Sequence, residues 1–354
     1  MAYTTINKST DYFNTVTYTG DNSSPRTITG VGFQPDMNWS KIRSESNDHW
    51  VSDAVRGSNK IIRPNGTDDE LVNGSGGYLS SFNADGYVIA AGSANNNNFN
   101  KSSGTMVSWN WKANGAGSAN TDGTISSTVS ANTTSGFSIV SYSGSNSNST
   151  VGHGLGVAPK VIIIKRLNTA DNWRVLHMSV GNDNTAHLNL TSGFSSSAVF
   201  QNTSPTSTVF SLVGNNTSVN QSGSTYIAYC FAEVTGYSKF GSYTGNGNDG
   251  SSTNNFIYTG FKPTWVMVKR SNDSGQQWTI CDTTRSPSNV SGSMEWLFAD
   301  NSGVETDEDL PYMLSNGFMP RTGHTYMNRD GFSYIYMAFG QSIVGSNNIP
   351  ATAR

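Results

Sequence analysis

Residues 260–272 read GFKPTWVMVKRSN, and the same arrangement of residue types occurs at 156–166 (GVAPKVIIIKR) and at 32–44 (GFQPDMNWSKIRS). In every copy a lysine follows the proline by six residues. Glycine permits a tight turn, and a proline where a strand begins need not donate a hydrogen bond to the sheet. In the run TWVMVKR, successive side chains would point to opposite faces, as in a β-strand. The repeated stretch therefore predicts the entry into one strand in each of three related units.

Further landmarks recur in the same order around each copy. A Tyr-Thr-Gly or Tyr-Ser-Gly triplet precedes it, a tryptophan follows the proline by 14 or 15 residues, and a segment rich in aromatic residues closes the unit. The landmarks lie at Tyr18, Trp50 and 105–113 in the first unit, at Tyr142, Trp173 and 225–233 in the second, and at Tyr243, Trp278 and 332–340 in the third. A fixed order of landmarks at a regular period is typical of internal repeats.

The repeat divides the chain into three modules. The predicted organisation is an N-terminal segment (1–11), module 1 (12–114), a Gly/Ser/Asn-rich joint (115–135), module 2 (136–236), module 3 (237–341) and a C-terminal tail (342–354). No segment has the capped, 3.6-residue periodicity of a helix over three turns. We expect an all-β protein of three related β-sandwich modules, jelly-roll-like and built from antiparallel strands.

Three local features can be predicted from the same patterns. A second strand, which ends near each tryptophan, is expected to pair with the repeated strand as a hairpin. The lysine that ends the repeated strand (Lys41, Lys165 or Lys269) is expected to extend its ammonium group into water. The two cysteines, Cys230 and Cys281, lie in apolar strand-like runs and are expected to be buried free thiols.

The composition argues against several classes of partner. Only 13 % of the residues are charged and the formal net charge is −3, so neither a nucleic acid nor an anionic membrane is an expected partner. No apolar run approaches the length of a membrane span, and the N-terminus lacks the pattern of a secretory signal. Because 11 % of the residues are aromatic, the Gly-, Asn- and Ser-rich sequence does not indicate disorder. We expect a chain that folds in a reducing cytoplasm.

No catalytic, cofactor or metal site is predicted. The sequence has neither a G-x-S-x-G nucleophile motif nor histidine pairs at metal-binding spacing. The five histidines are His49, His153, His177, His187 and His324. His153, in the stretch GHGLG, is expected to be a turn residue. We therefore expect no enzyme activity, and the sequence identifies no receptor-binding residue.

An acidic cluster occurs in module 1 and again at the matching place in module 3, and module 2 has none. They are Asp68, Asp69 and Glu70 before Leu71, and Asp307, Glu308 and Asp309 before Leu310. The favoured interpretation is a solvated acidic turn. Carboxylates of this kind also bind Ca²⁺ or, as a pair, hydrolyse glycosides, and both alternatives stay open. The duplication argues against catalysis, because repeats preserve packing motifs more readily than they place two active sites.

An Asp-x-x-Arg motif and the tryptophan landmarks each allow a structural and a binding interpretation. Asp53 with Arg56, and Asp282 with Arg285, follow the tryptophan in modules 1 and 3. The favoured interpretation is an ion pair that fixes a loop, and the alternative is a ligand site. The tryptophans Trp50, Trp173 and Trp278 are expected in the core, and the alternative is a platform on which sugars stack.

Taken together, the landmarks resemble a domain of unknown function that is found in structural proteins of bacteriophages. The resemblance rests on the opening Tyr-Thr-Gly, the pattern GFxPxxxxxKxRS with its following tryptophan, the stretches SFNADGY and SNGFM, and the closing segments TMVSWNWKA and TYIAYCFAE. It covers nearly the whole chain, from about Tyr12 to Gln341. Proteins with this domain are commonly described as tail-fibre, tail-fibre-like or virion proteins. The resemblance therefore implies a part of the virion, and it supplies no catalytic residues.

Two functions are compatible with this resemblance. The first is a tail fibre or appendage that helps attachment to a glycan or protein of the host surface, because polar loops on a rigid β scaffold suit weak multivalent binding. The alternative is a head decoration, head fibre or collar protein without receptor binding, which the short segment before module 1 and the lack of coiled-coil heptads favour. A polysaccharide depolymerase is a minor alternative. Other virion proteins are the expected partners, and no cofactor is expected.

The closing segments also lead to an expectation about assembly. TMVSWNWKA and FSYIYMAFG carry large apolar residues on both faces of the predicted strand. One sandwich core cannot cover both faces, so part of this surface should be buried between modules or between chains. Closed symmetry prevents growth into filaments. The expected state is a homo-oligomer, with a trimer favoured.

Overall fold

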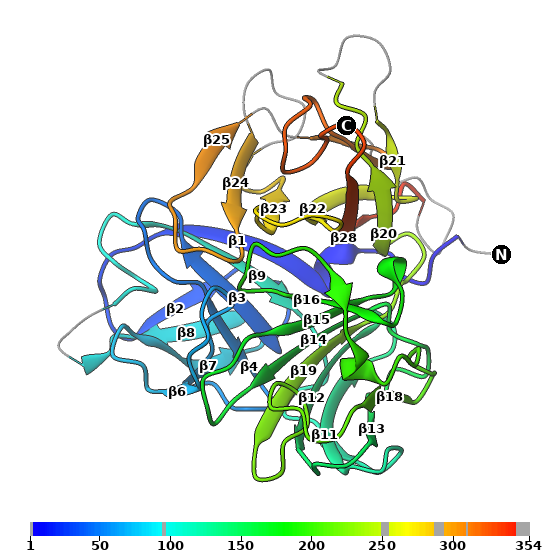
Figure 1. The fold of residues 1–354 in the computed structure, drawn as a ribbon. Coiled ribbons are helices and arrows are strands. Elements are labelled where there is room, and N and C mark those ends of the chain that lie inside the picture. Colours follow the sequence, from blue (N-terminus) through cyan, green and yellow to red (C-terminus); the bar gives the residue numbers. More distant parts are fainter. Residues whose placement is uncertain (1–2, 94–96, 249–254, 287–293, 309–310, 345–354) are drawn as a thin grey trace.

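The computed structural model describes residues 3–93, 97–248, 255–286, 294–308 and 311–344. Figure 1 shows β-strands throughout the described part of the chain, and the described residues contain no α-helix. Three short 3₁₀ turns are described, namely η1 (Ser9–Asp11), η3 (Met178–Val180) and η4 (Ala198–Phe200). Neighbouring strands in every sheet are antiparallel. The prediction of an all-β fold with antiparallel strands is confirmed.

Each module contains a main sheet in which four strands follow one order. In module 1 these strands are β1 (Phe13–Thr19), β9 (Thr105–Trp111), β3 (Met37–Ile42) and β4 (Trp50–Asp53). In module 2 they are β12 (Phe137–Ser143), β19 (Thr225–Phe231), β14 (Val161–Arg166) and β15 (Arg174–His177). In module 3 they are β20 (Ser238–Thr244), β28 (Ser333–Gln341), β22 (Lys262–Arg270) and β23 (Thr279–Asp282). The three modules therefore share the topology of their main sheets, and each repeated stretch forms the third strand.

A smaller sheet packs on one face of each main sheet and makes the module a sandwich. It consists of β2 (Arg26–Thr29), β8 (Gly86–Ala90) and β7 (Tyr78–Asn83) in module 1, of β13 (Ser149–Gly152) and β18 (Val209–Leu212) in module 2, and of β21 (Ile257–Tyr258), β27 (Gly317–Met319) and β26 (Tyr312–Leu314) in module 3. The other strands near the module borders are β5 (Lys60–Ile61), β6 (Leu71–Val72), β16 (Asn184–His187), β17 (Ser195–Ser196), β24 (Met294–Phe298) and β25 (Thr306–Glu308). An apolar core lies inside each sandwich.

The segment expected to be a joint, 115–135, forms strands instead of a linker. Strands β10 (Ser118–Asn120) and β11 (Ser127–Asn132) extend the main sheet of module 2 beyond β12. Val129 of β11 is buried against the core of this sandwich. The small polar residues of the segment thus form the edge of a sheet, where one face contacts solvent and little apolar surface is needed.

The tryptophan landmark of module 1 was wrongly aligned from the sequence. In the three hairpins Met37 pairs with Asp53, Val161 with His177 and Trp265 with Asp282, and these three pairs occupy equivalent positions. Counting back four residues from each second-strand partner reaches Trp173 in module 2 and Trp278 in module 3, but His49 in module 1. Trp50 lies one residue further along, on the opposite side of its strand, in the core of its own sandwich. The second strands also begin at or just after the tryptophan, not before it.

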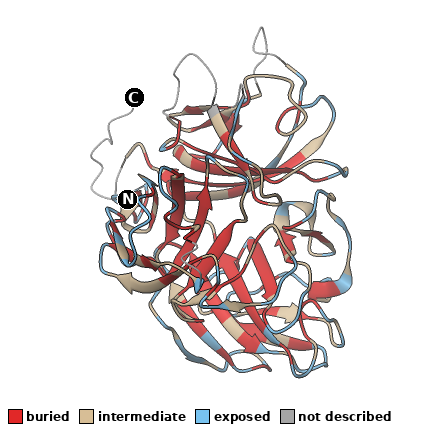
Figure 2. Ribbon diagram, turned by 90° about the vertical axis from the view of Figure 1, so that its left-hand side faces the viewer, coloured by how far each residue is buried: buried red, intermediate tan, exposed pale blue. Residues whose placement is uncertain are grey.

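The closing strands β9, β19 and β28 divide their side chains between two cores. One set of alternate residues faces the centre of the molecule, and these residues are Val107, Trp109, Trp111, Ile227, Tyr229, Phe231, Ile335, Met337 and Phe339. In β19 and β28 the other set fills the sandwich of its own module, with Tyr226, Ala228, Cys230, Tyr334, Tyr336 and Ala338. Figure 2 shows that the buried residues gather in strands in the interior of the molecule, and most residues of β9, β19 and β28 are buried.

The three main sheets meet at a common central core. Trp265 of module 3 stands edge-on to Trp111 of module 1, with ring centres 5.7 Å apart. Trp111 in turn stands edge-on to Phe231 of module 2, at 6.4 Å. The apolar surface expected between modules or between chains is therefore buried between modules of one chain. A homo-trimer stays a prediction, and these residues no longer support it.

The N-terminal segment closes the arrangement between modules 1 and 3. Ile6 is buried in the central core. The backbone N–H of Ser9 donates to Oε1 of Gln341 at 2.7 Å, and the Tyr3 hydroxyl donates to the Gly260 carbonyl at 2.8 Å. The start of the chain is thus attached to the end of the last closing strand.

Candidate functional site

The three interfaces between modules are built from equivalent backbone contacts. After each repeated strand, a backbone carbonyl accepts a hydrogen bond from the preceding module of a cycle. Glu70 N–H donates to Leu167, Phe194 N–H to Ser271 and Glu305 N–H to Arg43. A second set runs in the opposite direction, from Asp171 N–H to Thr67, from Gly275 N–H to Thr191 and from Asn47 N–H to Ser302. The cycle joins module 1 to 2, 2 to 3 and 3 to 1. The modules are therefore one body with approximate threefold symmetry.

A side-chain contact repeats at the same interfaces and explains why the Asp-x-x-Arg aspartate is missing from module 2. Asp53 Oδ2 accepts from the Tyr229 hydroxyl at 2.7 Å, and Asp282 Oδ2 accepts from Trp109 Nε1 at 2.9 Å. The residue of β28 equivalent to Tyr229 and Trp109 is Met337, which cannot donate. His177 replaces the aspartate there, and its Nε2 lies 3.1 Å from the backbone carbonyl of Tyr336. At each interface, the residue at this position can therefore form a hydrogen bond with the closing strand of the neighbouring module.

The tryptophan landmarks of modules 2 and 3 make a third repeated contact between modules. Trp173 Nε1 donates to the Arg63 carbonyl of module 1, and Trp278 Nε1 donates to the His187 carbonyl of module 2, both at 2.9 Å. His49 takes the equivalent place in module 1, where its Nδ1 accepts from Trp39 Nε1 at 3.0 Å. Trp50, Trp173 and Trp278 are all buried, so their predicted core position is confirmed and none of them is a platform for sugars.

The Asp-x-x-Arg motifs form buried ion pairs, as predicted. Arg56 binds Asp53 and Glu70, with Nη1 3.2 Å from the Glu70 carboxylate. Arg285 binds Asp282 and Glu305, with Nη1 2.6 Å from the Glu305 carboxylate. Burial alone would lower the pKa of each arginine, but Asp53 beside Arg56 and Asp282 beside Arg285 raise it above its ordinary value. Both networks lie at interfaces, between modules 1 and 2 and between modules 3 and 1.

The repeated lysines are not in contact with water, and the prediction that they extend into solvent was wrong. Lys41, Lys165 and Lys269 have no exposed surface. Lys165 Nζ donates to the Arg166 carbonyl at 2.8 Å and to the Thr67 carbonyl of module 1 at 3.2 Å. None of the three forms a salt bridge with a carboxylate of the described residues. Burial, which disfavours the charged form, lowers the pKa of each lysine to about 8.

These lysines predict that stability rises with pH above neutrality. Unfolded lysine keeps its proton up to its ordinary pKa of 10.5, whereas the folded lysines lose theirs at about 8. Between these values the unfolded chain binds more protons, so the free energy of unfolding increases with pH, by on the order of 1 kcal/mol per pH unit for each lysine. Burial raises the pKa of Cys230 and Cys281 above 9.0, so the thiols reverse the trend at higher pH.

Urea unfolding at about pH 7, 8 and 9 measures this dependence. Lys165→Met should flatten the slope by about a third, because one of three equivalent groups is removed. Lys160→Met, at an exposed position of the same module, is the control and should leave the slope unchanged. A free energy of unfolding that falls between about pH 7 and 8 would contradict the assignment.

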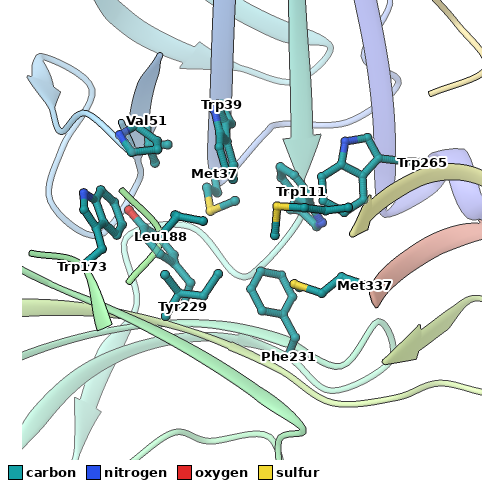
Figure 3. Close-up of a pocket in the computed structure, with 13 residues that line it drawn as sticks. Met37, Trp39, Val51, Trp111, Trp173, Leu188, Tyr229, Phe231, Trp265 and Met337 are labelled. Carbon is teal, nitrogen blue, oxygen red and sulfur yellow. The ribbon is translucent and has the colours of Figure 1, made fainter. Parts of the chain in front are cut away.

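A small apolar cavity of about 20 Å³ lies at the centre of the three modules. Figure 3 shows side chains from all three modules converging on it, among them Met37, Trp111, Tyr229, Trp265 and Met337. A volume of this size holds about one water-sized sphere, and the lining offers no polar surface. The cavity is therefore a packing gap and has no room for a ligand.

A larger cleft opens between modules 2 and 3, with a volume of about 550 Å³. The module 2 side consists of η3, the start of β16 and Phe194, and the module 3 side of the outer end of β20, the residues after β22 and the start of β28. The lining residues are Ser179, Val180, Asn184, Phe194, Ser242, Tyr243, Thr244, Ser271, Asn272 and Ser333. None of them carries a charge. The cleft can therefore offer hydroxyls, amides and two apolar side chains to a ligand.

The candidate site residues predicted from the sequence lie outside this cleft. Asp68 and Asp69 are exposed, and Glu70 is engaged with Arg56 and Lys60. Asp307 is exposed on β25, whereas Asp309, Leu310 and the side chain of Glu308 lie outside the described residues. The carboxylate of module 3 that corresponds to Glu70 is Glu305, just before the predicted cluster.

The remaining candidates have structural positions. His153 is a buried turn residue whose Nδ1 accepts from the Leu155 N–H, and Cys230 and Cys281 are buried free thiols, as predicted. In the part of the chain that is described, no three His, Cys, Asp or Glu side chains are grouped to hold a metal ion. Nor do the described residues include a helix with the length and apolar character needed to cross a membrane.

Comparison with protein-family models gives a match over most of the chain. The model of a family defined by a domain of unknown function, DUF7483, matches residues 8–342, which is most of the chain. No curated protein matches the sequence. The match begins within the N-terminal segment and ends just after β28, so it includes all three modules.

Proposed function

The chain belongs to the DUF7483 family, and from this premise we propose that it is a non-enzymatic part of a bacteriophage particle. In this proposal it is a tail fibre or other appendage that contributes to attachment of the particle to the host surface. The phage context comes from the resemblance of the repeated landmarks to a domain found in structural proteins of bacteriophages. The attachment role comes from the way in which the fold presents its surface. The proposed partners are other virion proteins and a host-surface glycan or protein.

The observation that carries the attachment role is the cyclic closure of the three modules. Six inter-module backbone hydrogen bonds and the common central core hold the sandwiches as one body. Binding loops on a rigid scaffold lose little conformational entropy when they meet a ligand. Such sites can be individually weak, because several copies on one particle raise the overall avidity by orders of magnitude. An uncharged cleft between two modules is a place where such binding can occur.

Electron microscopy of particles labelled with a gold-conjugated antibody against this chain tests the proposal. We expect label on the tail or its appendages, and we expect antibody fragments to slow adsorption of particles to host cells. Label confined to the head, together with unchanged adsorption, would overturn the attachment role. It would favour a head decoration without receptor binding.

A further inference from the structure

We propose that the cleft between modules 2 and 3 binds a neutral oligosaccharide. The inference deepens the proposed function and rests on it for the biological setting, since it names the class of host ligand and the place where it binds. Its physical basis is independent of that setting. It consists of a break in the threefold symmetry, of the chemistry of the lining and of the fixed geometry of the lining residues.

The symmetry break appears when the three interfaces are compared at one equivalent position. Glu70, Phe194 and Glu305 make the same backbone hydrogen bond to the next module. At two interfaces this residue is a glutamate bound to a buried arginine, and the charged network occupies the space between the modules. At the interface of modules 2 and 3 it is Phe194, and His177 replaces the motif aspartate. Among the described residues, the charged network is therefore absent where the cleft lies.

The lining has the chemistry of a site for a neutral sugar. Sugar hydroxyls both donate and accept hydrogen bonds, and the lining supplies serine and threonine hydroxyls and asparagine amides, which do the same. Val180 and Phe194 add apolar surface, which suits the C–H face of a sugar ring. An anionic ligand would lack a basic partner in this lining, and a cationic ligand would lack an acidic one. The composition thus favours an uncharged ligand rich in hydroxyls.

Several lining residues are fixed in place by the fold. Asn184 Nδ2 donates to the Val180 carbonyl at 3.0 Å, and Asn272 Oδ1 accepts from the Ser333 N–H at 3.1 Å. The ring of Phe194 packs edge-on against buried Trp278, with ring centres 6.2 Å apart. Ser242 and Thr244 are exposed residues on one face of β20, so their side chains line the cleft side by side. A preorganised lining of this kind lowers the entropy cost of binding.

Binding of defined oligosaccharides to the full chain tests the proposal. The probes are neutral hexasaccharides of glucose, mannose, galactose and N-acetylglucosamine at up to about 10 mM, with sialyllactose and a random peptide mixture for comparison. The readout is the perturbation of backbone amide signals by nuclear magnetic resonance. We expect at least one neutral probe to perturb amides of residues 179–184, 194, 242–244, 271–272 and 333 and to leave the other interfaces unaffected.

Ser242→Trp fills the cleft, and Thr17→Trp is its matched control. Thr17 pairs with Val107 as Ser242 pairs with Ile335, so the two residues are equivalent, and both are exposed. We expect S242W to weaken sugar binding by about tenfold or more and T17W to leave it unchanged, with both variants folded. Equal affinity of S242W and wild type, perturbation of another surface, binding of peptide instead of sugar, or no binding of any neutral probe would each overturn the proposal.

Adsorption of the purified chain to host cells separates this inference from the function on which it rests. If the chain adsorbs and S242W adsorbs equally well, the attachment role stands and the cleft is not its site. If a neutral sugar binds in the cleft but the chain does not adsorb to cells, the site stands and the attachment role fails. Loss of adsorption in S242W, with T17W adsorbing normally, is the result that we expect.

Discussion

Replacing Arg285 by methionine is expected to lower the free energy of unfolding by about 3–5 kcal/mol, which is the range for removing one partner of a buried ion pair. The guanidinium has no exposed surface, binds Asp282 and Glu305, and donates to the Ile280 carbonyl at 3.0 Å. Methionine fills much of the same volume but leaves the Asp282 carboxylate buried without a cation. Asp282 also accepts from Trp109 of module 1, so the loss affects the interface of modules 3 and 1.

Urea unfolding of the full chain measures the effect, and a double variant identifies its cause. In Asp282→Asn/Arg285→Met the uncompensated charge is gone, so we expect part of the stability to return. Lys239→Met is the control, because the Lys239–Glu233 pair is partly exposed to solvent and should contribute less than about 1 kcal/mol. If the free energy of unfolding of the Arg285 variant matched that of wild type within about 1 kcal/mol, the ion-pair network would make no net contribution to stability.

The strands of the repeat could be predicted because local signals define them. The glycine, proline and alternating apolar residues of the repeated stretch correctly indicated β3, β14 and β22, and the hairpin with the following strand formed as expected. The fate of the lysine could not be read in the same way. Lys165 donates to the Thr67 carbonyl, which belongs to another module and lies 98 residues away in sequence. A polar group buried by a distant partner leaves no local signal.

The error at Trp50 has a related origin. Matching by residue type aligned it with Trp173 and Trp278, whereas the hairpin registers show that His49 is their equivalent. Because side chains alternate along a strand, a shift of one residue moves a side chain to the opposite face. Trp50 therefore packs in its own sandwich, while Trp173 and Trp278 pack in the central core.

The cleft was missed because two modules form it, with lining residues from Ser179 to Ser333. A signal was nevertheless present in the sequence. Module 2 lacks both the Asp-x-x-Arg motif and the acidic cluster. These two absences coincide with the interface at which the described residues form no charged network. In a repeat protein, a module that departs from its neighbours at equivalent positions is where a function beyond packing can be sought.

The central core leads to the second large prediction, for Trp265→Ala. Trp265 is buried on β22, and its ring lies 5.7 Å from Trp111 and 6.1 Å from Phe13 of module 1, as well as 5.7 Å from Phe339 of module 3. Its Nε1 makes no hydrogen bond in the described part of the chain, so the substitution removes apolar contacts and leaves no polar partner unpaired. The expected loss in the free energy of unfolding is about 3–5 kcal/mol.

The same variant shows whether the modules unfold together. Since Trp265 joins two modules and the backbone contacts close the cycle, we expect one unfolding transition, with faster amide hydrogen exchange in β9 and β19 as well as in β28. Tyr258→Ala in the same module is the control, because this ring is 60 % exposed and its removal should cost less than about 0.5 kcal/mol. Two separate transitions, with β9 protected while β28 exchanges, would mean that the sandwiches are independent and that the shared core does not unite them.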